Sequence, residues 1–292
     1  MQRGKTTVNI LQGKRKNGVP ITALSASDYS TASLLEEAEI DIALVGDSLG
    51  MTVLGYPDTK PVTMDEMIHH AKAVSRGARK TFLVGDMPFL SYQGCAIDAI
   101  RNAGRFLKEA GMDCVKVEGG KEAIPGIEAI ASAGIPVIGH ISYPQTPRAT
   151  KENDTIETNL KAAVEFLDLV KGIERAGCFA IVLIRVPDGI ARIISERFSM
   201  ITIGLGSGPW CHGQVLVAHD MLGLSTMVTP EFNKQYQTLA RLVLEAFKQY
   251  QSEVVQKIFP SNEHYEHLES SFIDSLVATL DKAGFSPSRR RE

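Results

Sequence analysis

Short apolar segments alternate with longer helical patterns along most of the sequence, and this alternation limits the possible folds more than any other feature. The segments are of strand length and rich in β-branched residues: 19–25, 41–46, 81–85, 114–117, 135–139, 179–184, 200–204 and 215–218. Repeated strand–helix units are typical of a parallel sheet, and eight such units are the number that closes an α/β barrel. The sequence therefore predicts an α/β fold, a (β/α)8 TIM barrel.

The segments between the strands have helical periodicity, and two of them carry start signals. Thr63 and Glu66 have the spacing of a capping box, and Thr158 is placed to cap the helix predicted from residue 159. Two further amphipathic segments, 230–251 and 264–283, follow the last strand and either close the barrel or pack between subunits. We expect one domain over residues 1–292, with an N-terminal extension (1–18), additional C-terminal helices (230–285) and a tail (286–292).

The composition excludes several classes of protein. A formal net charge of −3 provides no basic surface for nucleic acid, and no apolar run approaches the length that spans a bilayer. The four cysteines lie far apart without a CxxC pair, so neither a zinc ribbon nor a disulfide framework is indicated. We expect a cytoplasmic protein that binds neither nucleic acid nor membrane, and the basic residues near the N-terminus leave a mitochondrial presequence open.

Polar residues follow most of the predicted strands, at the face where α/β barrels hold their chemistry. They are Ser27, Asp28, Asp47, Ser48, Asp86, Lys116, Glu118, His140, Arg185, His219 and Asp220. Asp47, Asp86 and Glu118 come from three adjacent strands, and such carboxylates repel one another unless a cation neutralises them. We therefore predict that these three ligate Mg²⁺ or another divalent metal, although each taken singly could also cap a helix or form an ion pair.

Lys116 lies two residues before Glu118, so both side chains point to the same face of their strand. An ammonium group beside the metal can pair with the carboxylate of a substrate. A 2-keto acid suits this arrangement, because its carboxylate and keto oxygen can both reach the metal, which then stabilises an enolate. We predict a small-molecule keto acid as substrate.

The same residues lie within motifs that resemble those of the ketopantoate (3-methyl-2-oxobutanoate) hydroxymethyltransferase family of the pantothenate pathway. The motifs are VGDSLGMTV at 45–53, PVT at 61–63, GDMPF at 85–89, VKVEGG at 115–120, GH at 139–140 and GQVLV at 213–217, followed by His219 and Asp220. They occur in the family's order over about three quarters of the chain.

The resemblance implies a metal-dependent barrel that transfers a hydroxymethyl group from 5,10-methylenetetrahydrofolate to 3-methyl-2-oxobutanoate. It implies that Asp47, Asp86 and Glu118 bind Mg²⁺. It also implies that Ser48 and Lys116 hold the keto acid, with Asp47 and Asp86 beside it. Relatives of this kind are homo-oligomers, often decamers, and we expect a homo-oligomer here.

The chain departs from the family pattern in three regions. The family's general base is a glutamate near the end of the sixth strand, where this chain has Ile184, followed by Arg185. Isoleucine cannot accept a proton, and an arginine stays protonated. The loop after His140 differs over 141–157. In the turn after the seventh strand His212 replaces an aspartate close to an unusual Trp210, and Ser27 replaces a tyrosine.

We therefore expect a diverged member that forms or cleaves a carbon–carbon bond in a 2-keto acid through a metal-stabilised enolate. His140 and His212 are the candidates for the missing base, because we expect each to follow a strand at the catalytic face and imidazole titrates near neutral pH. Arg185 is the candidate for a second anion clamp. One alternative is the authentic folate-dependent hydroxymethyltransferase. Another is a non-catalytic paralogue that binds a metabolite, or that binds a true family member and regulates it.

Overall fold

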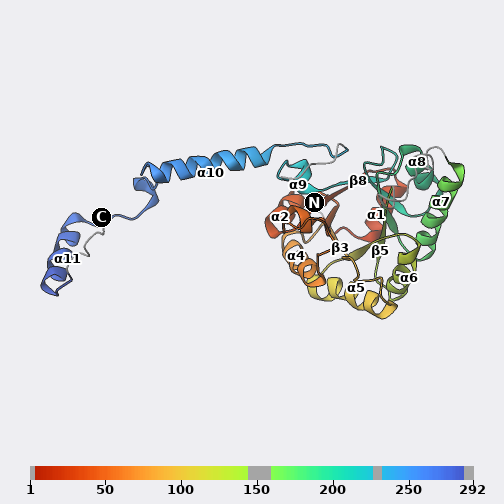
Figure 1. The fold of residues 1–292 in the computed structure, drawn as a ribbon, viewed down its shortest axis with the longest axis horizontal. Coiled ribbons are helices and arrows are strands. Elements are labelled where there is room, and N and C mark those ends of the chain that lie inside the picture. The colour runs from red at the N-terminus through yellow and green to blue at the C-terminus, as the bar shows by residue number, and fades with distance from the viewer. Residues whose placement is uncertain (1–3, 144–158, 226–231, 286–292) are drawn as a thin grey trace. The chain divides into compact units, whose positions relative to one another are not determined.

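Eight parallel strands close into a barrel in which each strand pairs with its neighbours in the sequence and β8 pairs with β1 (Figure 1). The computed structural model describes residues 4–143, 159–225 and 232–285. The strands are β1 (Ile21–Ser25), β2 (Ile42–Val45), β3 (Phe82–Asp86), β4 (Cys114–Glu118), β5 (Val137–Ser142), β6 (Ala180–Ile184), β7 (Ile201–Leu205) and β8 (Gly213–Leu216). The predicted TIM barrel is thus confirmed, with each predicted strand within a few residues of its observed place.

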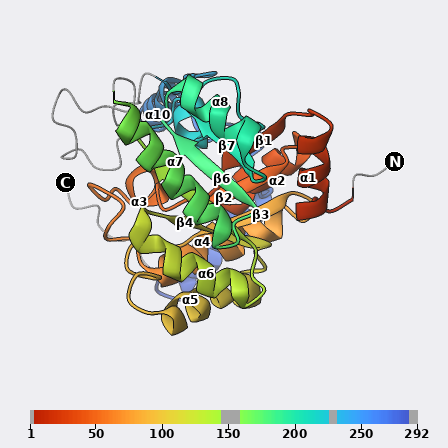
Figure 2. The ribbon, with the colours of Figure 1, turned by 90° about the vertical axis from the view of Figure 1, so that its right-hand side faces the viewer.

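Helices cover the outside of the barrel (Figures 1 and 2). They are α1 (Val8–Lys16), α2 (Tyr29–Glu37), α3 (Leu49–Thr52), α4 (Met64–Gly77), α5 (Ala96–Ala110), η1 (Lys121–Ala123), α6 (Ile124–Ser132), α7 (Leu160–Arg175), α8 (Asp188–Arg197) and α9 (Ala218–Met221). The helix α1 was not predicted from the sequence. Its N-cap is Thr7, whose hydroxyl accepts a hydrogen bond from the Ile10 amide.

Local sequence signals explain where several helices begin. Thr63 and Glu66 form the predicted capping box of α4, in which each side chain accepts from the other residue's backbone amide. The N-cap of α7 is Asn159, which accepts from the amides of Lys161 and Ala162. The predicted cap Thr158 lies outside the described residues, as do the tail 286–292 and most of the divergent loop 141–157.

The apolar core has two layers. An outer layer lies between the sheet and the helices, and there Gly85 has no room for a side chain, because a Cβ would overlap the ring of Phe106 on α5. The inner layer fills the barrel with alternating strand residues, among them Phe82 and Val84. Leu11 of α1 belongs to this inner cluster, so α1 closes the end of the barrel where the strands begin.

Residue contacts divide the chain into two units, Met1–Thr238 and Leu239–Glu292. The second unit contains α10 (Leu239–Val255), η2 (Asn262–His264) and α11 (Ser270–Lys282). The prediction of a helix from residue 230 is wrong over residues 232–238. Tyr236 donates its amide to the Met221 carbonyl, and the Asn233 side chain donates to Asp220, so this segment is bonded to α9 instead. The single domain over 1–292 stays a prediction.

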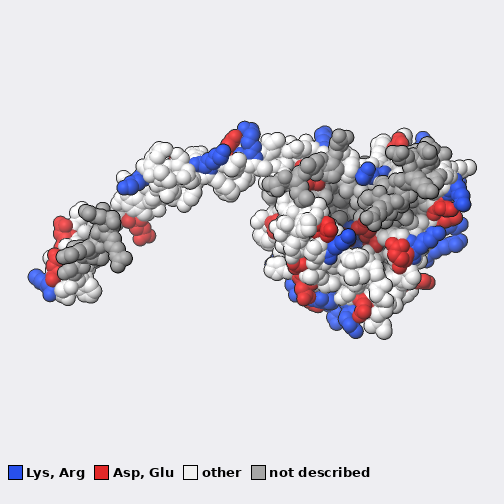
Figure 3. All heavy atoms as spheres, in the orientation of Figure 1, with Lys and Arg blue, Asp and Glu red and all other residues white. Residues whose placement is uncertain are grey.

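None of the helices in the described parts of the chain combines the length and the apolar character needed to span a bilayer. On the face drawn in Figure 3, lysine and arginine are interspersed with aspartate and glutamate on the barrel and do not form one basic surface.

Candidate active site

The inner face of the barrel changes from apolar to charged towards the C-terminal ends of the strands. Side chains two residues apart on a strand point the same way, so Asp86 continues the inner series of Phe82 and Val84, and Lys116 follows Cys114. A small cavity of about 20 Å³ lies among the apolar inner residues, with Lys116 in its lining. The charged groups therefore lie directly beyond the apolar filling of the barrel.

Four charged or ionisable side chains at this end of the barrel are linked one to the next by short contacts. Lys116 Nζ lies 3.0 Å from Asp86 Oδ2 and 3.0 Å from His140 Nδ1, and His140 Nδ1 lies 3.2 Å from Glu118 Oε2. Asp86 is 2% exposed, and Lys116 and His140 are each 5% exposed. His140 Nε2 is buried without a hydrogen-bond partner among the described residues. The structure thus brings together the predicted site residues of β3, β4 and β5.

The carboxylates dominate the electrostatics of this cluster. Burial alone would lower the pKa of Lys116, but the charges of Asp86, Glu118 and Asp47 raise it, so the ammonium form is favoured. Burial and the charge of Asp47 raise the pKa of Asp86, against the opposing effect of Lys116. Burial and crowding thus disfavour the charged form of Asp86, and a further cation would stabilise that form.

Asp47 and Ser48 follow β2 and lie beside Asp86. The amide of Asp47 donates to Asp86 Oδ2 at 3.1 Å. A Cβ on Gly46 would stand 3.3 Å from Ser48 Oγ and 3.8 Å from Asp86 Oδ2, so the glycine lets these polar groups approach one another. This turn brings the predicted substrate residue Ser48 to the same end of the barrel as Lys116.

The donor set fits a hard cation in chemistry but is not assembled around one point. Carboxylate oxygens are the ligands that Mg²⁺ prefers, and Asp47 and Asp86 supply them at neighbouring strand ends. Glu118 turns instead to His140. Within residues 4–143, 159–225 and 232–285, no three His, Cys, Asp or Glu side chains are grouped closely enough to hold an ion as they stand. The metal role of the three acids stays a prediction.

A pocket of about 340 Å³ adjoins this cluster on the side of β4 and β5. Its lining comprises Glu118, Gly119, Gly120, Glu122, His140, Ile141 and Ser142. Sequence reasoning missed Glu122, although its place just after the Gly-Gly turn that ends β4 was a usable signal. It also missed Tyr92, which is buried and donates its hydroxyl to the Glu118 carbonyl.

The end of β6 carries the departure from the family pattern. Ile184 is the last residue of β6, is partly exposed, and pairs with Ser142 of β5. Arg185 follows it with an exposed side chain and a left-handed backbone (φ 57°). Ser207 fixes this turn, because its hydroxyl donates to the Leu183 carbonyl and accepts from the Val186 amide.

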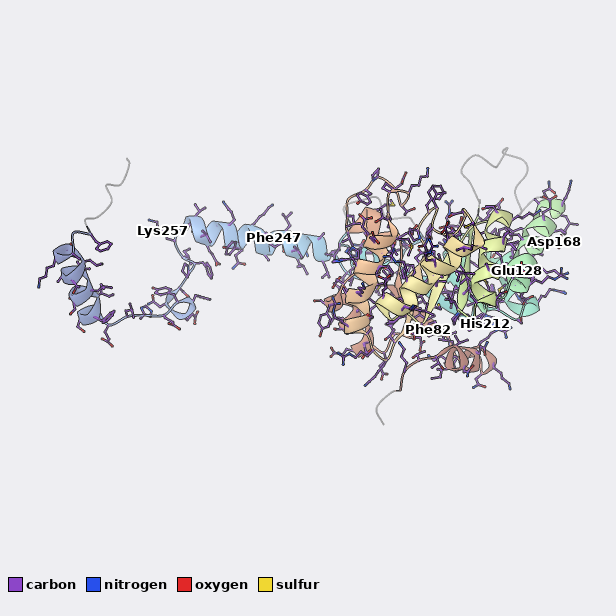
Figure 4. All side chains as sticks on the ribbon, turned by 90° about the horizontal axis from the view of Figure 1, so that it is seen from below. Phe82, Glu128, Asp168, His212, Phe247 and Lys257 are labelled. Atoms are coloured by element: carbon purple, nitrogen blue, oxygen red, sulfur yellow. The ribbon has the colours of Figure 1, made fainter. Side chains whose placement is uncertain are left out.

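The expectation that His212 lies at the catalytic face is wrong. His212 immediately precedes β8, and the residue before a parallel strand lies at the N-terminal end of the barrel. Its Nδ1 is 2.8 Å from the hydroxyl of Thr202, the second residue of β7, and its carbonyl accepts from the Ile21 amide. Burial and the charge of Arg15 of α1 lower its pKa. In Figure 4 His212 lies on the same side of the barrel as Phe82, where β3 begins.

Other polar residues at strand ends have structural contacts. Asp28 is the N-cap of α2 and accepts from the Thr31 amide at 2.9 Å. The carbonyl of Ser27 lies 2.6 Å from His70 Nδ1, and Asp220 accepts from Asn233. These groups are bonded locally, so we do not include them in the candidate active site.

Solved structures with similar folds confirm the architecture. A 2,3-dimethylmalate lyase of the PEP mutase/isocitrate lyase superfamily aligns with a TM-score of 0.57 at 13% identity, covering 96% of each chain. A phosphonopyruvate hydrolase, solved as a complex with oxalate and Mg++, aligns with a TM-score of 0.57 at 14% identity, covering 96% of this chain and 100% of the other. At such low identity these similarities describe the fold.

Sequence comparison is more specific. Proteins named 3-methyl-2-oxobutanoate hydroxymethyltransferase from Syntrophomonas wolfei and Clostridium novyi are 44% and 46% identical over 275 residues, covering 93% of this chain and 99% of each relative. The family described as ketopantoate hydroxymethyltransferase matches residues 5–262. That match includes all eight strands and every residue of the buried Asp86–Lys116–His140 cluster. The chain belongs to the ketopantoate hydroxymethyltransferase family of enzymes.

Proposed function

We propose that this enzyme forms or cleaves a carbon–carbon bond next to the carbonyl of a 2-keto acid. The observation that carries the proposal is the buried Lys116 ammonium, held by Asp86 where the strand ends meet. Once a metal cation offsets the neighbouring carboxylates, this ammonium is suited to pair with the carboxylate of a small acid. Ser48, beside Asp86, would hold the same substrate.

A divalent cation fits the crowded carboxylates of this cluster. Asp47 and Asp86 would hold it, with Glu118 as the third ligand and the buried His140 fixing the position of Glu118. Mg²⁺ would supply Lewis acidity to the keto oxygen. The carboxylates fix the cation, Lys116 neutralises the substrate, and the apolar layer beneath Lys116 excludes water from the reacting end.

The substrate and donor follow from the relatives and from Ile184. The relatives are named for 3-methyl-2-oxobutanoate, so this keto acid, with 5,10-methylenetetrahydrofolate as cosubstrate, is the substrate if the reaction is the authentic one. Ile184 supplies no base at the position that the family resemblance assigns to glutamate. We therefore propose a diverged catalyst that uses another donor or runs towards cleavage.

A non-catalytic, regulatory role is the second candidate, and the apolar Ile184 is the observation that favours it. The cluster of Asp86, Lys116 and His140 argues against it. Burying three ionisable groups costs free energy, and a chain without chemistry would gain nothing from that cost.

Arg185 gives this proposal its first test. Its exposed guanidinium forms no ion pair with the described residues. It can therefore bind a carboxylate through two parallel hydrogen bonds. We expect the wild type to prefer dicarboxylic over monocarboxylic 2-keto acids. Arg185→Ala should reduce that preference by about 10-fold or more, the effect of one charge-assisted hydrogen bond worth about 1.5–3 kcal/mol. Turnover across a panel of both classes measures it.

His212→Ala is the matched control, because His212 lies at the opposite end of the barrel. It should lower stability without altering substrate preference. The anion-clamp role is refuted if Arg185→Ala leaves the preference unchanged. A change with His212→Ala would contradict the placement of the site. The role of His140 as a base stays a prediction.

We further propose that the enzyme is a homo-oligomer. Within the described residues of α10 and α11 no side chain is buried, yet both helices are amphipathic. Phe247 on α10 is 67% exposed (Figure 4), and contiguous exposed apolar faces mark protein interfaces. Residues of the same character on these helices are Leu242, Val243, Leu244, Tyr250, Phe272, Ile273, Leu276 and Val277.

Light scattering of the purified chain tests this assembly. The wild type should have the mass of several subunits, and Phe247→Asp should shift it towards smaller species, because a carboxylate in an apolar interface is costly. Lys248→Asp changes charge at the next position of the same helix and should have the smaller effect. A monomeric wild type would refute the proposal.

A further inference from the structure

We propose that Glu122 is the general base that removes the proton from the carbon next to the keto group. Glu122 belongs to η1, which follows the Gly-Gly turn at the end of β4, and it lines the same pocket as Glu118 and His140. The inference rests on the function proposed above and adds the residue that accepts the proton.

The turn after β4 is built around the Glu122 carboxylate. The Gly120 amide donates to Glu122 Oε1 at 2.7 Å. A Cβ at Gly119 would come within 3.1 Å of Oε1, and one at Gly120 within 2.7 Å of Oε2, while Gly119 has a φ of 146° that side chains rarely adopt. The two glycines thus give the carboxylate its space and hold it at the strand end.

Two of the other carboxylates near the site are already engaged. Glu118 pairs with His140, and Asp86 pairs with Lys116. Glu122 forms no ion pair with the described residues. Its side chain is exposed to solvent, with which it can exchange a proton. Of the two carboxylates in the pocket lining, Glu122 is therefore the one available to accept a proton.

The pocket also reaches the strand β5 that pairs with the position of the missing glutamate. Ser142 lines it, and Ser142 pairs with Ile184 in the register of β5 and β6. The amide of Tyr143 donates to the Ile184 carbonyl at 2.9 Å, which fixes this edge. A carboxylate on the β4 side can thus serve the same space that a carboxylate at the end of β6 would serve.

The C3–H bond of the bound 2-keto acid breaks, and its proton passes to an Oε of Glu122. The electron pair moves into the C2–C3 bond, and the negative charge comes to rest on the keto oxygen. The new nucleophilic carbon then attacks the electrophile, or takes a proton back from Glu122 when none is present.

Proton exchange in heavy water isolates this step from the identity of the donor. The wild type with Mg²⁺ and 3-methyl-2-oxobutanoate in D₂O should replace the C3 proton by deuterium, which proton NMR follows directly. Glu122→Gln keeps the shape but removes the base, so the exchange rate should fall by about 10²-fold to 10⁴-fold. Keto-acid binding, measured by calorimetry, should stay within a factor of about three of the wild type.

Glu128→Gln is the matched control, because Glu128 is an exposed acid on α6 outside the pocket lining (Figure 4). It should exchange like the wild type, and Glu122→Asp should retain part of the rate. Equal exchange by Glu122→Gln and Glu128→Gln overturns the role of Glu122 and leaves the proposed function intact. A wild type that neither binds nor exchanges 3-methyl-2-oxobutanoate or a dicarboxylic 2-keto acid overturns both.

Discussion

Replacing Asp86 by alanine is expected to abolish Mg²⁺ binding and to lower the free energy of unfolding by about 3–5 kcal/mol. The carboxylate is 2% exposed and lies 3.0 Å from Lys116 Nζ, so its removal leaves a buried ammonium group without its direct partner. It also removes the oxygen donor nearest to Asp47. Calorimetric titration with Mg²⁺ and denaturant unfolding measure the two effects.

Asp113→Ala provides the control for this experiment. Asp113 pairs with Lys5 and accepts from the Leu83 amide at the N-terminal ends of the strands, so its loss should reduce stability and leave Mg²⁺ binding unchanged. Asp86→Asn keeps the side-chain volume while removing the charge, and it should also fail to bind Mg²⁺. Equal binding by the wild type and Asp86→Ala would remove Asp86 from the metal site.

Introducing glutamate at position 184 is expected to raise folate-dependent hydroxymethyl transfer by about 10²-fold or more. A positioned base contributes about 10²-fold to 10⁴-fold, and the family resemblance assigns the base to this position. The wild type should therefore transfer hydroxymethyl from methylenetetrahydrofolate to 3-methyl-2-oxobutanoate far more slowly than the Clostridium novyi relative assayed in parallel. Single-turnover formation of product measures both.

The double variant Ile184→Glu with Glu122→Gln separates the two sides of the pocket. It should retain both the gained transfer and the exchange of the C3 proton, because a carboxylate introduced at the end of β6 removes that proton without Glu122, which lies after β4. Ile184→Gln is the isosteric control and should gain nothing. A wild type as fast as the Clostridium novyi relative would contradict the divergence. No gain from Ile184→Glu would assign the loss to the altered loop 141–157.

The sequence predicted the barrel and most of the candidate site because both follow from strand periodicity. Charged or ionisable residues are unusual at the ends of strands that are buried on both faces, so their residue types alone indicated a site. These residues are Asp86, Lys116, Glu118 and His140. Placing His212 failed for a physical reason. The connection between β7 and β8 contains no helix among its residues and returns along the barrel, so a residue at its end lies far from one at its start.

The contacts of individual side chains could not be read from the strand pattern. Glu118 turning to His140, and Glu122 held by the Gly120 amide, depend on rotamers and on turn geometry. Helix α1 was missed because its mean character is polar and a single residue, Leu11, anchors it in the core. Residues 232–238 form hydrogen bonds to α9 instead of extending α10. An amphipathic pattern within one segment does not predict such bonds to another segment, so the predicted helix begins too early.

Because α1 closes the end of the barrel where the strands begin, residues in the turns at the opposite end can be substituted without changes to the core. At the closed end Lys14 of α1 pairs with the buried Asp41, and Thr202 ties His212 to α8 through Ser195. These contacts hold the strands at the end where we propose no substrate site, while Arg185 at the other end is exposed and lies outside the packed layers. Lineages of such an enzyme can explore new acids and new electrophiles by changing a few turn residues, at small risk of unfolding.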